Sequence, residues 1–192
     1  MNTYIAFLRG INVGGRNLIK MDTLRAFFAE LGFKNVRTYI QSGNVVFESA
    51  STNATALERK IENKLKERLG QQVSVIVRTL PDLTAAVKRN PFKKFDLGAD
   101  VATFVVLIDR EPKTKQILPL ISTKENLEVF QIRNGVAFVI ARRKQDGRCG
   151  FPNAFVEKQL GVIGTTRNWS TLNKIVQFAE TIDTNVVKRK KS

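Results

Sequence analysis

Two stretches of the chain decide its fold: residues 3–9, Thr-Tyr-Ile-Ala-Phe-Leu-Arg, and residues 103–109, Thr-Phe-Val-Val-Leu-Ile-Asp. Both are short apolar runs rich in β-branched and aromatic residues, a composition typical of strands. The second stretch repeats the pattern of the first. We therefore expect two similar halves, each beginning with one of these strands.

The order of elements in the first half follows from hydrophobic spacing and turn residues. The expected elements after the first strand are a Gly- and Asn-rich break at 10–17, a helix ending at Gly32, strands at 36–40 and 45–48, a helix that begins at a Thr55-x-x-Glu58 capping box and ends at Gly70, and a strand at 73–78. Helical spacing, glycine stops and a short glycine-containing connection support these assignments. The order is β-α-β-β-α-β, the split βαβ order of ferredoxin-like domains.

The second half is expected to be a degenerate copy. A connecting helix begins at Pro81 with Thr79 as N-cap, and the expected later elements are the strand at 103–109, a short helix between Pro112 and Pro119, strands at 127–132 and 136–141 around Asn134-Gly135, a helix at 154–160, a loop at 162–169 and a final helix. The last strand is not expected. We predict an α+β fold of two ferredoxin-like halves, at 1–79 and 101–192 with a connection at 80–100, packed as one unit with a C-terminal helix and a basic tail.

Composition excludes several reaction classes. The chain of 192 residues has no His and one Cys, Cys149. Without His there is no imidazole relay and no His metal ligand, and one Cys forms neither an internal disulfide nor a thiolate zinc site. We expect no metal and no cofactor. Cys149 as a lone nucleophile beside Arg148 is a minor alternative. The N-terminal apolar run is too short for a signal or membrane segment, so we expect a cytoplasmic protein.

The positive charge of the chain leaves nucleic-acid binding open. The formal net charge is +15, and it is spread over both halves, with one cluster at Lys188-Arg189-Lys190-Lys191. Dispersed charge favours nonspecific affinity for polyanions, whereas a dedicated site concentrates charge on a face. Residues 135–139, Gly-Val-Ala-Phe-Val, partly match an RNA-binding signature, but a lone Phe138 is more typical of a core residue.

The stretch from Gly10 to Asn17 is the first candidate for chemistry. It lies between a strand and a helix, where backbone N–H groups can bind an anion. It resembles a phosphate-binding P-loop, but Arg16 and Asn17 replace the Lys and the hydroxyl that this chemistry needs. Two alternatives stay open: a loop whose glycines only permit tight turns, and a loop that binds a phosphate or carboxylate.

A polar rim is predicted where the first strand ends. If that strand pairs antiparallel with the third, its end meets the connection at 41–44. The residues brought together would be Arg9, Asn12, Arg16, Gln41, Ser42 and Asn44, and Gly14 and Gly15 of the glycine-rich loop are further candidates for ligand binding. Guanidinium and amide groups suit the binding of an oxyanion better than proton transfer. In the alternative, Ser42 and Asn44 only satisfy a turn.

A third segment precedes the final helix. It contains Thr166, Arg167, Asn168 and Trp169, the only Trp of the chain, followed by Ser170. Asn168 or Ser170 is a candidate N-cap. Trp169 either anchors this cap or joins a ligand pocket, because Trp fills both roles.

The three segments together resemble a known bacterial family. Residues 6–15 (Ala-Phe-Leu-Arg-Gly-Ile-Asn-Val-Gly-Gly), 36–47 (Val-Arg-Thr-Tyr-Ile-Gln-Ser-Gly-Asn-Val-Val-Phe) and 164–171 (Gly-Thr-Thr-Arg-Asn-Trp-Ser-Thr) are similar to the family catalogued as domain of unknown function 1697. Asn90-Pro91-Phe92 and the run from Glu157 to Gly161 also resemble it. The resemblance implies two ferredoxin-like halves and no established activity.

These observations favour one function and leave two alternatives. The leading hypothesis is binding, with or without turnover, of a small anionic or phosphorylated ligand at the polar rim. The alternatives are nonspecific nucleic-acid binding and an interaction protein without ligand chemistry. Whether the segment at 165–170 reaches the rim, and the oligomeric state, lie beyond the sequence.

Overall fold

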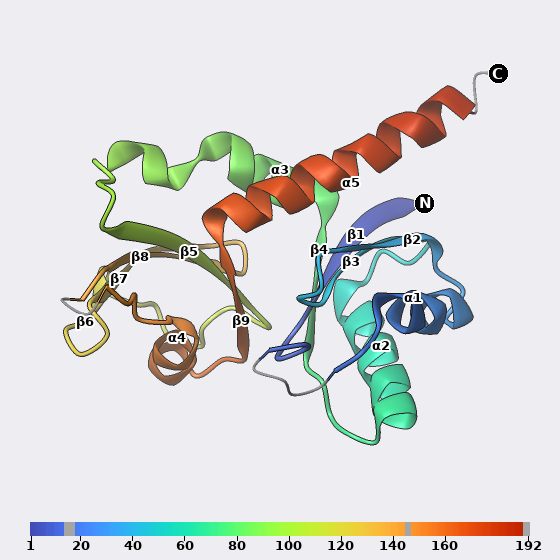
Figure 1. The fold of residues 1–192 in the computed structure, drawn as a ribbon, viewed down its shortest axis with the longest axis horizontal. Coiled ribbons are helices and arrows are strands. Elements are labelled where there is room, and N and C mark those ends of the chain that lie inside the picture. The colour runs from blue at the N-terminus through green and yellow to red at the C-terminus, as the bar shows by residue number, and fades with distance from the viewer. Residues whose placement is uncertain (14–17, 145–146, 190–192) are drawn as a thin grey trace. The chain divides into compact units, whose positions relative to one another are not determined.

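The chain folds as an α+β protein with two antiparallel sheets. The computed structural model describes residues 1–13, 18–144 and 147–189, and over these residues it contains five α-helices (Figure 1). The chain divides into two compact units. The first unit comprises Met1–Ala85 with Lys174–Ser192, and the second comprises Ala86–Asn173.

The first unit has the β-α-β-β-α-β order expected from the sequence. Its elements are β1 (Asn2–Leu8), α1 (Met21–Glu30), β2 (Lys34–Tyr39), β3 (Asn44–Ser49), α2 (Ala54–Leu69), β4 (Val75–Thr79), the first part of α3 (Leu80–Arg89) and the larger part of α5 (Trp169–Arg189). The strands form a sheet in the order β2-β3-β1-β4. The strand β1 pairs antiparallel with both β3 and β4, which confirms the pairing predicted for the first and third strands.

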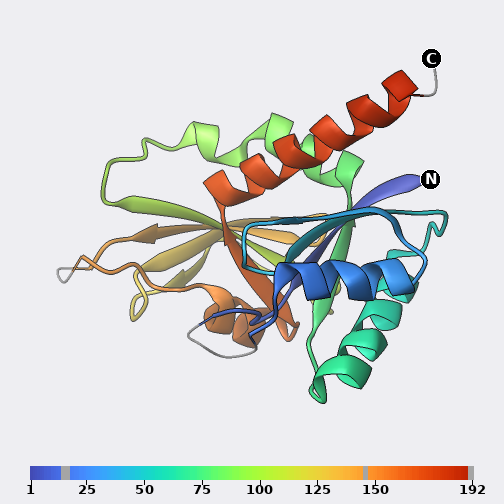
Figure 2. The ribbon, with the colours of Figure 1, turned by 45° about the vertical axis from the view of Figure 1, so that its right-hand side comes forward.

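Both faces of this sheet are buried. Tyr4, Ala6 and Leu8 of β1 belong to a core that includes Phe28 of α1 and Ile61 of α2. On the other face, Ile5 and Phe7 are also fully buried. Figure 2 shows α5 on the side of the sheet opposite to α1, and the rings of Tyr39 and Phe178 lie 5.4 Å apart there. Apolar residues occupy β1 continuously because both its faces need cover.

The N-cap of the helix α2 lies two residues before the one that the sequence indicated. Asn53 is the N-cap, and its Oδ1 accepts from Ala56 N at 3.0 Å, so the predicted Thr55-x-x-Glu58 capping box is wrong. Glu58 instead accepts a hydrogen bond from the backbone of β4. At α3 the prediction is confirmed, because Thr79 Oγ1 accepts from Asp82 N at 3.2 Å. Asn and Thr are both strong N-caps, so the pattern alone did not choose between Asn53 and Thr55.

Two glutamates of α2 cover the free edge of the sheet. Val75 N donates to Glu62 Oε1 at 2.9 Å, and Val77 N donates to Glu58 Oε1 at 2.8 Å. The strand β4 pairs only with β1 in this sheet, so its outward N–H groups would otherwise lack a ladder partner. The side chains of α2 therefore protect an edge that could pair with another chain.

The second unit contains a five-stranded sheet. Its elements are the rest of α3, the 3-10 helix η1 (Pro91–Lys94), β5 (Val101–Ile108), β6 (Leu120–Ser122), β7 (Leu127–Arg133), β8 (Val136–Arg142), α4 (Asn153–Leu160), β9 (Gly164–Asn168) and the start of α5. The strand order is β6-β7-β8-β5-β9. One face packs against Val156 and Leu160 of α4.

Two expectations for this half are wrong. A strand, β9, occupies the predicted loop at 162–169 and pairs antiparallel with β5. It lacked an apolar signal because Thr165, Thr166 and Arg167 are polar although they are buried. The expected helix between Pro112 and Pro119 is absent from this described stretch, which leads into β6. So short a segment is costly to nucleate as a helix, and the residue before Pro119 is biased away from helical backbone.

The opposite face of the second sheet carries aromatic rings. Phe92 of η1 lies with its ring centroid 6.0 Å from Phe138 of β8, 5.3 Å from Phe130 of β7 and 5.2 Å from Trp169. Phe138 is 1% exposed. Phe138 is therefore a core residue, as its lone position in an alternating strand indicated, and it offers no surface for stacking a base.

A search of the described residues for membrane spans gave no candidate. None of the helices in that part of the chain combines the length and the apolar character needed to cross a bilayer.

Candidate functional site

The predicted meeting of β1 with the β2–β3 turn is present in the first unit. Leu8 N donates to Gly43 O at 2.8 Å, and Phe7 is the register partner of Asn44. Arg9 follows directly and is exposed, with its N–H donated to Ser74 O at 2.9 Å. The end of β1 and the turn therefore form one rim, with Arg9 at its edge.

Gly43 allows the close approach of the two chains at this rim. Its φ is +70°, and a Cβ built there would lie 3.0 Å from Leu8 Cβ and 3.3 Å from Ile11 Cβ. A side chain at this position would have to displace the end of β1 and would also hold a left-handed backbone. The turn thus needs glycine for two independent reasons.

Asn12 holds the β1–α1 connection against the turn. Its Nδ2 donates to Ile19 O at 3.0 Å and to Gln41 O at 2.9 Å, while its Oδ1 accepts from Ile19 N at 2.8 Å. Asn12 has a φ of 55°, a left-handed conformation that Asn tolerates better than most residues. Its amide joins three parts of the rim, and these bonds occupy both of its polar atoms.

Asn44 has a structural role at the same turn. It is fully buried, and its Nδ2 donates to Tyr39 O at 3.2 Å and to Ser42 Oγ at 2.9 Å. These bonds correspond to the alternative in which Ser42 and Asn44 satisfy the turn. Gln41, by contrast, is exposed and lines a pocket.

That pocket is a hollow of about 660 Å³ beside the first turn of α1. It is lined by Asn12, Leu18, Ile19, Lys20, Met21, Asp22 and Gln41. Lys20 is the N-cap residue of α1 and makes no side-chain capping bond, so a ligand can approach the N–H groups of the first turn. The carboxylate of Asp22 is paired with Arg25. Sequence reasoning missed residues 18–22, whose one signal was their place between the glycine-rich stretch and the helix.

Three of the predicted ligand-binding residues have no described position. Gly14, Gly15 and Arg16 lie outside the described residues. The described rim therefore consists of Arg9, Asn12, Gln41, Ser42 and Asn44, to which the structure adds Lys20.

The third predicted segment belongs to the second unit. Thr166, Arg167 and Asn168 are in β9, and Trp169 is the first residue of α5. Arg167 donates to Thr165 Oγ1 at 2.9 Å and to Thr166 O at 2.8 Å. Burial lowers the pKa of Arg167 to about 10, because desolvation disfavours the charged form. The guanidinium is still charged at neutral pH, so its burial costs free energy.

The side chains of the described residues set the chemistry that is open to this site. They contain no group of three or more Asp, Glu or Cys side chains placed to hold a metal ion. Cys149, the minor nucleophile candidate, is partly buried and packs against the core of the second unit. At the rim, the exposed side chains of Arg9 and Lys20 are cationic and that of Gln41 is an amide. Such groups bind oxyanions through charge-assisted and amide hydrogen bonds.

The geometry so far defines an α+β protein with a small polar pocket at the end of its first strand. Residues 1–138 match the family described as protein of unknown function (DUF1697), and the chain belongs to that family. Among solved structures it is similar to a conserved bacterial protein from Streptococcus pneumoniae. That similarity has 24% sequence identity and a TM-score of 0.64, and it covers 94% of this chain and 99% of the other. A search of curated proteins found no match.

Proposed function

We propose that the chain binds a small anionic ligand, such as a phosphorylated metabolite or nucleotide, in the pocket at the end of β1. The observation that carries this proposal is the first turn of α1, which begins in a 660 Å³ pocket and lacks a side-chain cap from Lys20. The N-terminus of a helix carries a partial positive charge and unsatisfied N–H donors. An anion is the natural complement of these groups.

The side chains around the helix start add to this preference. Lys20 lines the pocket, and Arg9 stands at the end of β1. Asn12 bonds to Ile19 at the entry to α1 and to Gln41 in the turn. The protein groups that would bind the ligand are therefore held in place before binding. Such preorganisation lowers the cost of ordering on binding. Asp22 also lines the pocket, and its pairing with Arg25 offsets part of its negative charge.

A thermal-shift screen of phosphorylated metabolites tests the proposal. A ligand should raise the melting temperature of the wild-type chain and lose about tenfold or more in affinity in Arg9→Ala and in Lys20→Gln. Lys34→Gln is the matched control. This substitution removes one exposed lysine of the first unit. Lys34 pairs with Glu48 of β3, and Glu48 pairs with Thr3, so Lys34 lies near the end of β1 opposite to the rim. A hit that survives both rim substitutions, or that Lys34→Gln weakens equally, contradicts this site.

The type of fold of each half and the boundaries between the halves are also proposals. We propose that both halves are ferredoxin-like, with boundaries at 1–79, 80–100 and 101–192. A repeated pair of backbone bonds supports this reading. In the second unit Ile108 N donates to Gly135 O at 3.0 Å, and Asp109 N donates to Ile163 O at 2.9 Å. These two bonds correspond to those from Leu8 N to Gly43 O and from Arg9 N to Ser74 O at the end of β1.

The edges of the two sheets are covered in the same way, which gives further support. In the second unit Gly164 N donates to Glu157 Oε1 at 2.8 Å, and Thr166 Oγ1 donates to Asn153 Oδ1 at 3.1 Å. Asn153 and Glu157 stand one helical turn apart on α4, like the two glutamates of α2. In each half the helix that precedes the edge strand therefore binds that strand through residues four positions apart.

Other expectations from the sequence stay predictions. These are the contribution of Thr166, Arg167, Asn168 and Trp169 to ligand binding, nonspecific nucleic-acid binding, and an interaction role without ligand chemistry. We also propose a cytoplasmic location, because a chain with a single Cys fits a reducing compartment.

A further inference from the structure

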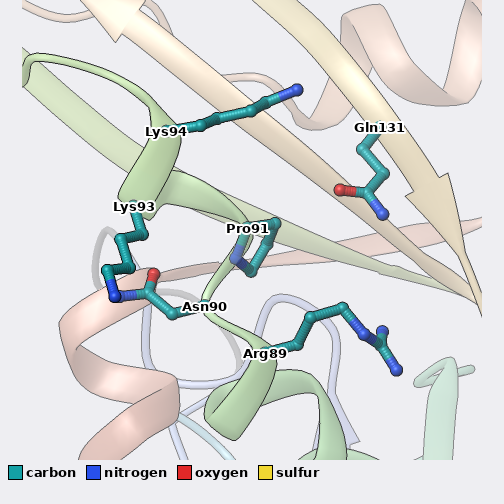
Figure 3. A pocket seen from close by; sticks show the side chains of 6 residues that line it. All are labelled: Arg89, Asn90, Pro91, Lys93, Lys94 and Gln131. Carbon is teal, nitrogen blue, oxygen red and sulfur yellow. The ribbon is translucent and has the colours of Figure 1, made fainter.

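A second pocket, in the second unit, is lined by more cationic side chains than the described part of the rim. It has a volume of about 410 Å³ and is lined by Arg89, Asn90, Pro91, Lys93, Lys94 and Gln131. Small-molecule sites commonly measure about 300–1,000 Å³. Figure 3 shows Lys94 and Arg89 extending on either side of Gln131, with Pro91 between them. None of the predicted site residues lies in this pocket.

Three cations and no carboxylate line the pocket. Arg89, Lys93 and Lys94 are exposed, and in the described part of the chain none of them forms an ion pair. Cationic side chains without a carboxylate beside them favour an anionic ligand. Lys94 is also held in place, because its Nζ lies 5.0 Å from the ring centroid of Phe95 and 5.1 Å from that of Phe130.

Asn90 provides an independent indication of a ligand. Its Oδ1 is buried and has no hydrogen-bond partner, the one such side-chain atom found among the described residues. Its backbone is left-handed, with φ at 41°, and is bonded on both sides: Asn90 N donates to Val87 O, and Asn90 O accepts from Lys93 N, each at 3.1 Å. A buried acceptor without a hydrogen bond is energetically unfavourable. A buried acceptor without a partner beside a pocket indicates a group that a ligand can satisfy.

A β-bulge brings Gln131 to this pocket. Val129 pairs with Val139 and Gln131 pairs with Phe138, so Phe130 is an extra residue of β7. Without this shift Gln131 would share the face of Val129, which packs against α4. With it, Gln131 shares the face of Phe138 and lines the pocket beside Pro91. Bulges of this kind are over-represented next to functional sites, where they redirect a side chain.

We propose that this pocket binds a small phosphate ester that also carries a hydroxyl or N–H group. The phosphate lies among Arg89, Lys93 and Lys94, and the hydroxyl or N–H of the ligand donates to Asn90 Oδ1. Gln131 adds an amide that can both donate and accept, and the Pro91 ring offers an apolar contact for the carbon skeleton. The site lies in the second unit and shares no residue with the rim, so either proposal can fail without the other.

Titration calorimetry with ribose 5-phosphate and with sulfate tests this assignment. Both probes are oxyanions, but sulfate lacks a hydroxyl donor. The wild-type chain should bind ribose 5-phosphate at least about tenfold more tightly than sulfate. Lys94→Gln and Arg89→Gln should weaken both probes about tenfold or more. Lys124→Gln, which removes an exposed lysine of the same unit outside the pocket, should change neither probe by more than about twofold.

Asn90→Gly separates the buried acceptor from the charges. Glycine accepts the left-handed backbone, so the variant removes Oδ1 and leaves the chain path possible. It should reduce the affinity for ribose 5-phosphate to that for sulfate and leave the affinity for sulfate unchanged. A thermal melt of each variant checks folding, and Lys94→Gln alone decides the charge argument if Asn90→Gly does not fold. Equal losses in Lys94→Gln and Lys124→Gln, or no saturable binding at millimolar ligand, overturn the proposal.

Discussion

Gly43 shows how single residues shape the rim. The cost of its left-handed backbone can be measured apart from the cost of its close approach to Leu8. Gly70 has nearly the same φ of +69°, but no atom lies within 4 Å of a Cβ built there. Gly70→Ala should therefore cost only the backbone penalty of about 1–2 kcal/mol. Gly43→Ala should cost about 1–3 kcal/mol more, because the methyl group meets packed neighbours. Urea unfolding measures both, and equal losses would show that the approach to Leu8 is not tight.

Asn12 should contribute to stability through its amide and not through its backbone. Asn12→Gly keeps the left-handed conformation but removes the bonds to Ile19 and Gln41, and it should lower the free energy of unfolding by about 1–3 kcal/mol. Asn35→Gly is the matched control, since Asn35 is exposed and also has positive φ, at 50°. It should change the free energy by about 0.5 kcal/mol or less. A comparable loss in both variants would contradict the role of the Asn12 amide.

At the scale of elements, the two glutamates of α2 should protect the edge of the first sheet. Glu58→Ala leaves Val77 N without its acceptor in a buried position, which should cost about 1–3 kcal/mol and speed hydrogen exchange at that amide. Glu67→Ala, on the same helix with a 63% exposed side chain, should cost about 0–1 kcal/mol. Exchange at Val77 that is as slow in Glu58→Ala as in the wild-type chain would refute the edge contact.

Elements with an apolar period were predictable from the sequence, and elements held by polar groups were not. The spacing of Leu24 and Phe28 indicated α1, and both are buried in the core that faces the sheet. The strand β9 was missed because its buried residues are polar: Thr166 bonds to Asn153, and Arg167 bonds to its own strand. Only the tertiary partners make such a sequence a strand, and single-sequence periodicity does not show them.

Part of the candidate site was also predictable from the sequence. Antiparallel pairing of the first and third strands placed Asn12 and Gln41 at one rim, and the structure joins them by a hydrogen bond. Lys20 was not found, because its position depends on where α1 begins. The basic pocket around Asn90 was not found either, because it depends on a bulge in β7, and a one-residue register shift leaves no clear mark in the sequence.

At the scale of the whole molecule, net charge should limit stability at low salt. The formal net charge of +15 implies self-repulsion in the folded state. Raising NaCl from about 10 mM to about 200 mM shortens the screening length severalfold, so the melting temperature should rise. The same molar change in an uncharged solute such as glycerol should have a smaller effect. A melting temperature that falls with NaCl would mean that ion pairs such as Glu30 with Arg68 outweigh the repulsion.

The most direct test of the proposed function is a titration of ¹⁵N-labelled protein with pyrophosphate, followed by the amide shifts of the first unit. Binding at the end of β1 predicts saturable shifts at Lys20, Met21 and Asp22, which line the pocket at the start of α1. These shifts should need about tenfold more ligand in Lys20→Gln and stay unchanged in Lys34→Gln. The absence of saturable shifts at these amides, or equal weakening in both variants, would contradict the proposed site.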